Sequence, residues 1–223
     1  MWRQDDAVHM AVRPVSVRIV ILTKEPIPGR VKTRLIPALG PEGAATFHGL
    51  LVWETIRLAQ QSGLPIDVSL AGDLNGRFAT DLRNQGVCVE SQVDGDLGAR
   101  MAYALRGPGR RVALGTDCVT FQPEWIVQAA ESSTQVAIGP AEDGGYWCIT
   151  VDVSTPGLFP TLFQKMNWST STVLDITKKR LTQAGHSITW LPTTFDVDVP
   201  SDLPRLKQHP SCPPHIRAAL NAI

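Results

Sequence analysis

Short apolar runs alternate with amphipathic, helix-like segments along most of the chain. Residues 17–23 (VRIVILT) form a nearly continuous β-branched run, which is the pattern of a strand buried on both faces of a parallel sheet. Similar runs lie at 66–71, 87–90, 112–115, 136–139, 146–151 and 187–191. Helical patterns lie at 41–58, 75–84, 97–105, 123–132, 171–184 and 200–207. This alternation predicts an α/β fold with a doubly wound, mainly parallel sheet and helices on both of its faces.

The length of 223 residues favours one large domain over two, because two halves would each bury little apolar surface. Residues 1–14 are polar and end at Pro14, so we interpret them as a flexible extension. The fold is expected over residues 15–207. Residues 208–223 then form a C-terminal tail, which is expected either to pack as a short helix or to contact another subunit.

The composition narrows the class of partner. Lysine and arginine total 21, as do aspartate and glutamate, so the chain lacks the net positive field typical of nucleic-acid binding. No apolar run approaches a membrane span, and two aspartates stand near the N-terminus, so we expect neither export nor membrane insertion. The four dispersed cysteines favour reduced thiols in the cytoplasm. Six tryptophans and the apolar C-terminal segment are compatible with a homodimer.

The segment that follows the first predicted strand is unusually cationic. It contains four cations and one acid in eleven residues, from Lys24 to Arg34. Where a strand of a doubly wound sheet ends, such a loop can hold phosphate oxygens through side-chain and backbone donors. A solvated basic turn is the simpler alternative. The loop fits neither a Walker A motif, which needs glycine before Lys32, nor the Rossmann glycine motif. The residues predicted to bind phosphate are Lys24, Gly29, Arg30, Lys32, Thr33 and Arg34.

Carboxylates follow two other predicted elements. Asp117 comes directly after the run at 112–115, at the sheet edge where ligands bind, and is our first metal candidate, although an aspartate there can also cap a helix. Asp196 and Asp198 would share one side of an extended segment. They either complete a metal site with Asp117 or stand at a turn before Pro200. The pattern makes Asp117 a candidate ligand of Mg²⁺ or Mn²⁺ and leaves both alternatives open for the second acidic cluster.

Three further turns contain polar residues that suit ligand contact. Asp94 and Arg100 flank a predicted helix start, where a plain turn with a helix cap is an equal alternative. Glu142 and Asp143 supply a general base, or belong to a simple hairpin turn. Trp168 can stack on a sugar or a base, or pack in the core, with Ser169 or Ser171 capping the next helix. The residues predicted at the substrate or acceptor are Gly144, Gly145, Tyr146, Trp168, Ser169 and Thr170.

Six motifs, taken in order, resemble one bacterial family. They are KEPIPGRVKTRL, GDLGARM, GTDC, GPAEDGGYW, NWSTSTVL and FDVDVPSDL, and the match spans about residues 17–207. The family is that of the glycosyltransferases associated with arsenosugar biosynthesis. It is similar to the GT-A class of nucleotide-sugar transferases and to small nucleotidyltransferases such as the molybdenum-cofactor and phospholactate guanylyltransferases. The resemblance implies a single GT-A-like domain that binds a nucleotide.

The resemblance also implies roles for individual residues. Gly29, Arg30, Lys32 and Arg34 would lie in the nucleotide loop. Asp117 and Asp198 would face the metal, and Glu142 and Asp143 would lie near the acceptor or the sugar. The family usually has G-S-D-C-P where this chain has Thr116 and Val119, so the proline that follows the GTDC motif is replaced here.

These observations give three functional hypotheses. The first is metal-dependent glycosyl transfer from a nucleoside-diphosphate sugar to a small hydroxyl acceptor, with Asp117, Glu142 and Asp143 as catalytic residues. The second is nucleotidyl transfer from a nucleoside triphosphate to a phosphorylated small molecule. The third is a nucleotide-binding protein without catalysis.

Overall fold

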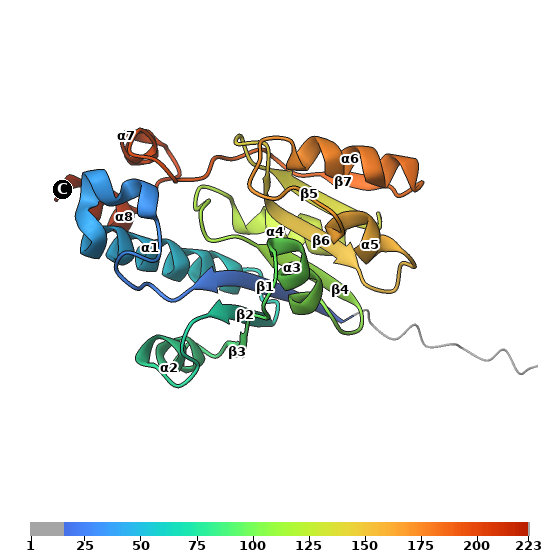
Figure 1. The fold of residues 1–223 in the computed structure, drawn as a ribbon, viewed down its shortest axis with the longest axis horizontal. Coiled ribbons are helices and arrows are strands. Elements are labelled where there is room, and N and C mark those ends of the chain that lie inside the picture. The colour runs from blue at the N-terminus through green and yellow to red at the C-terminus, as the bar shows by residue number, and fades with distance from the viewer. Residues whose placement is uncertain (1–15, 223) are drawn as a thin grey trace, which may run out of the picture.

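A seven-stranded sheet in the order β3-β2-β1-β4-β6-β5-β7 forms the centre of the protein (Figure 1). The computed structural model describes residues 16–222. Neighbouring strands are parallel except that β6 pairs antiparallel with both β4 and β5. The strands are β1 (Val17–Lys24), β2 (Ile66–Ala71), β3 (Cys88–Ser91), β4 (Arg110–Leu114), β5 (Val136–Pro140), β6 (Tyr146–Asp152) and β7 (Ile188–Trp190). The predicted doubly wound, mainly parallel sheet is confirmed.

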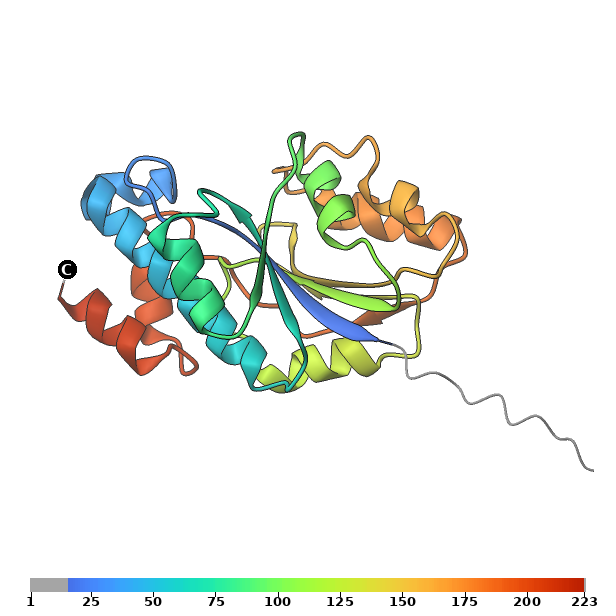
Figure 2. The ribbon, with the colours of Figure 1, turned by 90° about the horizontal axis from the view of Figure 1, so that it is seen from below.

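Helices cover both faces of this sheet, as Figure 2 shows. Helices α1, α2 and α4 contribute to the core on one face, whereas α3, α5 and α6 contribute to the core on the other. The helices are α1 (Ile36–Gln60), α2 (Arg77–Asn84), α3 (Leu97–Ala104), α4 (Pro123–Glu131), α5 (Leu158–Phe163), α6 (Val173–Gln183), α7 (Asp202–Gln208) and α8 (Pro214–Asn221). A short 3-10 helix, η1 (Thr33–Leu35), precedes α1.

Strand β1 is buried on both of its faces. Ile19 and Ile21 belong to the core cluster beneath α1 and α4, whereas Val20, between them, belongs to the cluster beneath α3 and α5. All three side chains are at most 2% exposed. Consecutive residues of a strand point to opposite faces of the sheet. Because both faces of β1 are buried, successive residues of the strand are apolar, as the sequence predicted.

A third core cluster lies beyond the ends of β1 and β4. It joins Leu35 and Phe47, near the start of α1, to Leu206 of α7 and Ile216 of α8. The tail region 208–223 thus contributes a helix to this cluster. The cluster fixes the loop after β1 against the C-terminal third of the chain. The predicted extension at residues 1–14 lies outside the described residues.

Some boundaries differ from the sequence pattern. Helix α1 starts at Ile36 rather than near Pro41, with a kink at Gly40, where φ is +70°. Strand β4 begins with Arg110 and Arg111, two charged residues that hid its first positions from an apolar pattern. Helix α5 was not predicted, since it has six residues and contains Pro160.

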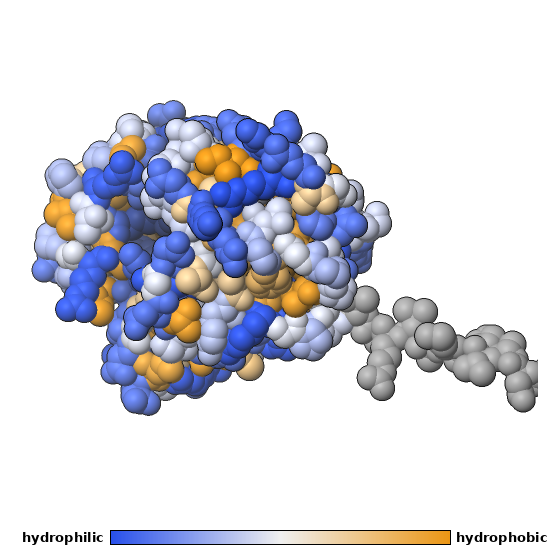
Figure 3. Space-filling model, turned by 45° about the vertical axis from the view of Figure 1, so that its right-hand side comes forward, coloured by the Kyte–Doolittle hydropathy of each residue, from blue (hydrophilic) through white to orange (hydrophobic). Residues whose placement is uncertain are grey.

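The surface shown in Figure 3 is mostly hydrophilic, with separate small hydrophobic patches. Within residues 16–222, no helix combines the length and apolar character that crossing a bilayer requires. All four cysteines are free thiols.

Candidate functional site

The cationic loop after β1 is fixed by two buried side chains. Val31 is 3% exposed and Leu35 is fully buried, and Leu35 belongs to the third core cluster. Positive φ values at Gly29 (+76°) and Lys32 (+44°) turn the chain between them. Lys24, Gly29, Arg30, Thr33 and Arg34 all remain exposed. The loop is therefore anchored while most of its cations stay available to a ligand.

Lys32 differs from the other cations of the loop because its side chain is only 4% exposed. Its ammonium group forms an ion pair with Asp117 and lies 3.9 Å from Asp198 Oδ1. It also donates a hydrogen bond of 2.7 Å to the carbonyl of Val197. Lys32 thus joins three segments that are far apart in the sequence.

The loop after β4 presents Asp117 at the surface. Every residue from Thr116 to Phe121 is buried except Asp117, whose side chain is 52% exposed. Val119 is 1% exposed and packs in the third core cluster. The loop is therefore anchored by its apolar residues, and the Asp117 carboxylate is the part of it that reaches solvent.

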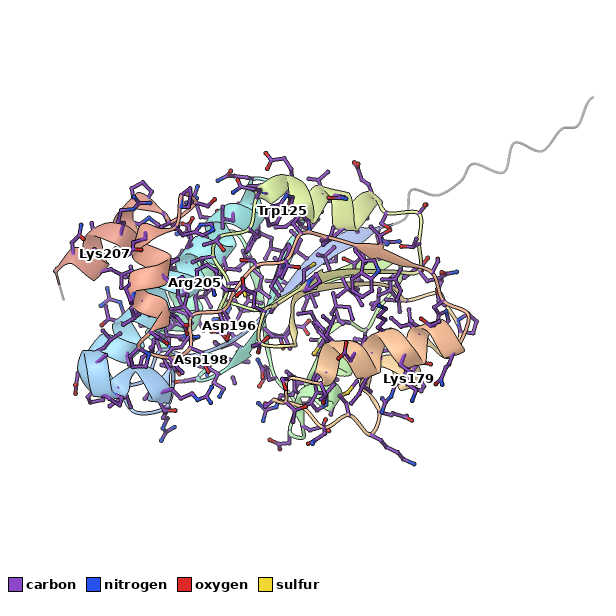
Figure 4. The ribbon with its side chains drawn as sticks, turned by 90° about the horizontal axis from the view of Figure 1, so that it is seen from above. Trp125, Lys179, Asp196, Asp198, Arg205 and Lys207 are labelled. Atoms are coloured by element: carbon purple, nitrogen blue, oxygen red, sulfur yellow. The ribbon has the colours of Figure 1, made fainter. Side chains whose placement is uncertain are left out.

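The segment 195–199 runs alongside this loop. Phe195 and Val197 are buried in the third core cluster, whereas Asp196 and Asp198 alternate with them and are only partly buried. The amide of Val197 donates to the Asp117 carbonyl at 2.9 Å. The predicted period-two arrangement of the two aspartates is confirmed. Figure 4 shows Asp196 and Asp198 beside one another, next to helix α7 and Arg205.

Asp198 has two positively charged neighbours. Its Oδ2 accepts a hydrogen bond of 2.6 Å from Arg34 Nη1, and Lys32 Nζ lies 3.9 Å from its other oxygen, Oδ1. The backbone around Asp198 is held by Asp202, whose carboxylate accepts hydrogen bonds from the amides of Asp198 and Val199, each at 2.8 Å. The cationic loop and the carboxylates of the β4 and C-terminal segments therefore meet at the carboxyl ends of β1 and β4.

Asp196 was considered with Asp198 in the sequence analysis but was not retained in the predicted metal pair. Burial raises the pKa of its carboxyl, and the neighbouring carboxylates Asp143 and Asp198 raise it further. The period-two spacing with Asp198 was the available signal, but the contribution of Asp143 depends on the fold and not on spacing.

Glu142 is held by Arg205 of α7. Two hydrogen bonds, of 2.7 and 2.6 Å, join its carboxylate to the guanidinium group, which also stacks 4.0 Å from the centre of the Phe195 ring. The hydrogen bonds from Arg205 lower the pKa of Glu142. A carboxylate held in this way is a weaker base. Its neighbour Asp143 accepts a hydrogen bond of 2.8 Å from the amide of Gly145 and is otherwise exposed.

The residues predicted at the acceptor lie together on the α3 and α6 side of the sheet. Gly144 has φ +88° in the predicted hairpin turn, and a Cβ built there would lie 2.0 Å from the Ser171 carbonyl oxygen. The hydroxyl of Tyr146 and the indole nitrogen of Trp168 are buried and have no hydrogen-bond partner within residues 16–222. Both rings pack against the core cluster beneath α3 and α5.

The turn before α6 differs from the sequence prediction. The cap of α6 is Thr172, without a side-chain hydrogen bond, so the expectation that Ser169 or Ser171 caps this helix is wrong. Ser169 instead has a positive φ of 61°, while the Thr170 hydroxyl donates to the Asn167 carbonyl at 2.9 Å. These two residues form the turn itself, which starts the chain towards α6.

The turn between β3 and α3 contains a helix cap, as one of the two sequence alternatives for this turn expected. Asp96 caps α3 by accepting a hydrogen bond of 2.8 Å from the Ala99 amide. Arg100 donates from Nε to the Gly95 carbonyl at 3.1 Å, and Asp94 is exposed. No contact joins Asp94 or Arg100 to the Lys32 and Asp117 group in the described part of the chain. Their predicted contact with the nucleotide stays a prediction.

His48 of α1 is a second residue that the sequence did not single out. It is 5% exposed, and its Nε2 lies 3.0 Å from the Lys24 carbonyl, where the cationic loop begins. Burial lowers the pKa of this imidazole. In the sequence it looks like one polar position of an amphipathic helix.

The residues that face Lys32 are of the type that binds a hard cation. Asp117 and Asp198 converge on one cationic nitrogen, and Mg²⁺ binds one or two protein carboxylates together with phosphate oxygens and water. Within residues 16–222 no cluster of three or more His, Cys, Asp or Glu side chains is arranged to hold a metal ion.

Comparison with known proteins identifies a family and a fold. The family model described as "Uncharacterized protein conserved in bacteria (DUF2064)" matches residues 55–170. No match was found among curated proteins.

Similar solved structures span nearly the whole chain. A "putative nucleotide-diphospho-sugar transferase" from Desulfovibrio desulfuricans G20 has a TM-score of 0.79 and 23% identity, over 93% of this chain and 98% of that chain. A nucleotidyl transferase from Methanothermobacter has a TM-score of 0.64 and 14% identity, over 93% and 99%. A Mycobacterium tuberculosis H37Rv protein in complex with manganese has a TM-score of 0.51 and 16% identity, over 85% and 97%. At these identities the likeness establishes the fold.

Proposed function

The chain belongs to the DUF2064 family, and we propose that it is a metal-dependent transferase that acts on a nucleotide substrate. The observation that carries this proposal is the contact of the buried Lys32 ammonium with Asp117, with Asp198 3.9 Å away. It places cations and carboxylates together where parallel strands end, which is where ligands bind in sheets of this type. The solved structures with this fold include a nucleotidyl transferase.

The exposed cations of the β1 loop are suited to phosphate groups. Lys24 and Arg30 are exposed on a loop whose two ends are anchored, and Arg34 lies beside Asp198. Guanidinium and ammonium groups at such a position would bind the diphosphate of a nucleotide and stabilise negative charge as it develops on the leaving group. Lys32 is committed to Asp117, so its role would be to position that carboxylate.

Asp117 and Asp198 would hold the divalent metal, Mg²⁺ or Mn²⁺. A metal bound to them would neutralise charge on the departing diphosphate. Lys32 pairs with Asp117 Oδ1, Arg34 pairs with Asp198 Oδ2, and Asp202 holds the backbone amide of Asp198, while the Asp117 side chain stays 52% exposed. The manganese complex among the similar structures supports this choice of ion.

The finer proposal is glycosyl transfer from a nucleoside-diphosphate sugar to a small hydroxyl acceptor. An inverting transfer needs a base that removes the acceptor proton. Asp143 fits this role better than Glu142, because Glu142 is held by Arg205 and its pKa is lowered. Gly144, Tyr146 and Trp168 would line the acceptor region. The link to arsenosugar biosynthesis stays a prediction.

One observation favours nucleotidyl transfer as the second candidate. The Glu142–Arg205 pair removes one of the two acids that a glycosyl acceptor would use, whereas nucleotidyl transfer to a phosphorylated acceptor needs no such acid. The two reactions require different substrates, namely a nucleoside-diphosphate sugar and a nucleoside triphosphate.

Thermal stability measured with a panel of ligands distinguishes these proposals. Nucleotides and nucleotide sugars are each added with and without Mg²⁺ or Mn²⁺, and stabilisation grows with ligand concentration relative to Kd. Either transferase predicts that metal increases the shift. Larger shifts with sugar diphosphates support glycosyl transfer, and larger shifts with triphosphates support nucleotidyl transfer.

The matched variants are Asp117→Asn and Asp81→Asn. The two aspartates have similar side-chain exposure, 52% and 47%, but Asp81 lies on α2 beside Arg77 and away from the site. Asp117→Asn is expected to abolish the metal-dependent part of the shift, and Asp81→Asn to preserve it. If nucleotides shift the melting temperature of the wild type equally with and without metal, and no bound nucleotide is turned over, the protein is a non-catalytic nucleotide-binding protein.

A further inference from the structure

A cavity lies at the opposite end of the sheet from Lys32. It has a volume of about 400 Å³ and includes the early residues of β1 to β4 together with the turn before β4. Its charged and reactive lining residues are Arg18, Asp67, Cys88, Glu90, Arg106 and Arg111. None of these belongs to the proposed transferase site, so the cavity raises a separate question of function.

Two of the three arginines are neutralised within the cavity wall. Arg18 binds Asp67 through two hydrogen bonds, of 2.6 and 2.5 Å. Arg106 donates to Glu90 at 2.7 Å and to the Tyr103 carbonyl at 2.8 Å, while its guanidinium stacks on the Tyr103 ring. Each acid is therefore paired with one arginine, and Arg111 is left as the excess charge.

Arg111 is the buried member of the group. It is 6% exposed, and its Nη1 has no hydrogen-bond partner within residues 16–222. Its Nε makes one long hydrogen bond, of 3.4 Å, to the Arg106 carbonyl. Burial and then the nearby Arg18 lower the pKa of Arg111, and Asp67, which is already paired with Arg18, offsets only part of this effect. A buried guanidinium without an anion is costly, because its desolvation is not compensated.

The backbone beside Arg111 is shaped to admit its guanidinium. Gly107 has φ +106°, and a Cβ placed on it would lie 2.8 Å from Arg111 Nη2. A side chain at residue 107 would push the guanidinium from its place. Glycine is therefore required twice here, for the backbone angle and for the space.

We propose that this cavity binds a small oxyanion, such as the phosphate group of a small molecule, through the guanidinium of Arg111. A planar guanidinium fork matches the geometry of phosphate and carboxylate oxygens. The volume is in the range of small-molecule sites, and a single excess charge suits a compact anion rather than nucleic acid. The proposal does not depend on the transferase function.

Inorganic phosphate and pyrophosphate are the probes, with the full-length protein in an anion-poor buffer. We expect either to raise the wild-type Tm by about 3 °C or more at ten times Kd. Arg111→Met should lose this shift, while Arg77→Gln, at a 94% exposed position of α2, should keep it. A shift that is kept in Arg111→Met but lost in Arg30→Gln would show that phosphate binds only at the nucleotide loop and would overturn the proposal.

Stability without phosphate provides a check on folding. Methionine removes the uncompensated charge but keeps apolar volume, so Arg111→Met should be at least as stable as the wild type in the anion-poor buffer. If this variant does not fold, the wild type alone still tests the proposal. Cys88 is exposed and lines the cavity, whereas the other three cysteines are buried, so a thiol reagent reports on Cys88.

Phosphate should slow the modification of Cys88 at least about fivefold, as expected when most of the sites are occupied. An unchanged rate together with an unchanged Tm would refute the site. The chain's own Asp5 and Asp6, which lie outside the described residues, are another source of oxygen ligands. If Asp5→Asn/Asp6→Asn alone lowers the Tm and speeds Cys88 modification in anion-poor buffer, the ligand is internal and the proposal of a free anion fails.

Discussion

Lys32 and Asp117 form an ion pair in which the ammonium group is almost fully buried and the carboxylate remains half exposed. The side chains are 4% and 52% exposed, respectively. The cation is therefore the structural half of the pair and the anion is the half that a ligand can reach. Because Lys32 also donates to the Val197 carbonyl, its removal would take away the polar contacts that this side chain makes with the β4 loop and the C-terminal segment, while the third core cluster still joins these segments.

Replacement of Lys32 by methionine should lower the free energy of unfolding by about 1–3 kcal/mol, the range for losing hydrogen bonds that involve a charged group. It would also leave Asp117 and Asp198 facing each other without the ammonium. Mg²⁺ should therefore restore more stability to Lys32→Met than it adds to the wild type. Urea unfolding with and without Mg²⁺ measures both effects, with Arg77→Met, at a 94% exposed position, as the control. An equal response of the two variants to Mg²⁺ would argue against a cation site at these carboxylates.

His48 should give the protein a measurable pH dependence. Its Nε2 donates to the Lys24 carbonyl, so the neutral ring has its unprotonated nitrogen, Nδ1, in a buried position without a partner in the described chain. Burial lowers the folded-state pKa below the ordinary value of 6.5. The unfolded chain then binds a proton more readily, so stability is full above pH 6.5 and is lost as the pH falls below it, by at most about 1.4 kcal/mol per pH unit.

His48→Gln should reduce this dependence, since glutamine keeps an amide donor for Lys24 but does not titrate. Chemical unfolding at pH 7.5, 6.5 and 5.5 gives the slope for each variant. His186→Gln, in the turn before β7, is the control and should retain the wild-type slope. A wild-type slope in His48→Gln would mean that other groups are responsible.

Gly98 should be intolerant of a side chain. A Cβ at this buried position in the first turn of α3 would lie 2.4 Å from the Phe163 carbonyl and 2.8 Å from Trp168 Nε1. Gly98→Ala should therefore destabilise the protein by about 1–3 kcal/mol, despite the higher helix propensity of alanine. Gly115→Ala is the matched control, because nothing lies within 4 Å of its added Cβ. Thermal unfolding of the two variants compares them, and equal melting temperatures would contradict the close approach.

The sequence was informative wherever one element determined the position of a residue. The carboxyl ends of parallel strands share one edge of a sheet, so the cationic loop after β1 and the aspartate after β4 were expected to meet, and they do. The two aspartates at 196 and 198 were likewise placed on one side by strand periodicity.

Properties that depend on several segments were not predictable from the sequence. The burial of Lys32 results from the packing of three loops, and lysine in a basic loop usually indicates a solvated charge. The pairing of Glu142 with Arg205 crosses 63 positions of sequence. The raised pKa of Asp196 results first from burial and then from the charge of Asp143, which belongs to a different turn. Helix α5 has too few residues for a periodic pattern, and Pro160 argues against a helix at that position.

The Glu142–Arg205 pair offers a final prediction. Both side chains are about half exposed, so a double-mutant cycle with Glu142→Gln and Arg205→Met should give a coupling energy of about 0.2–1 kcal/mol at pH 7. Arg205 lowers the folded-state pKa of Glu142 below its ordinary value of 4.5, so the coupling is present above that pH and is lost as the pH falls through the lowered pKa.

Measured at pH 7 and pH 3, the coupling should therefore decline towards zero in acid, and it should weaken in high salt because the pair is solvent-exposed. Arg205 also stacks on Phe195, so Arg205→Met alone loses packing that does not depend on pH, and the cycle separates this part from the charge interaction. A coupling of zero at pH 7 would mean that Arg205 does not restrain the Glu142 carboxylate. Glu142 would then regain its place beside Asp143 as a candidate base.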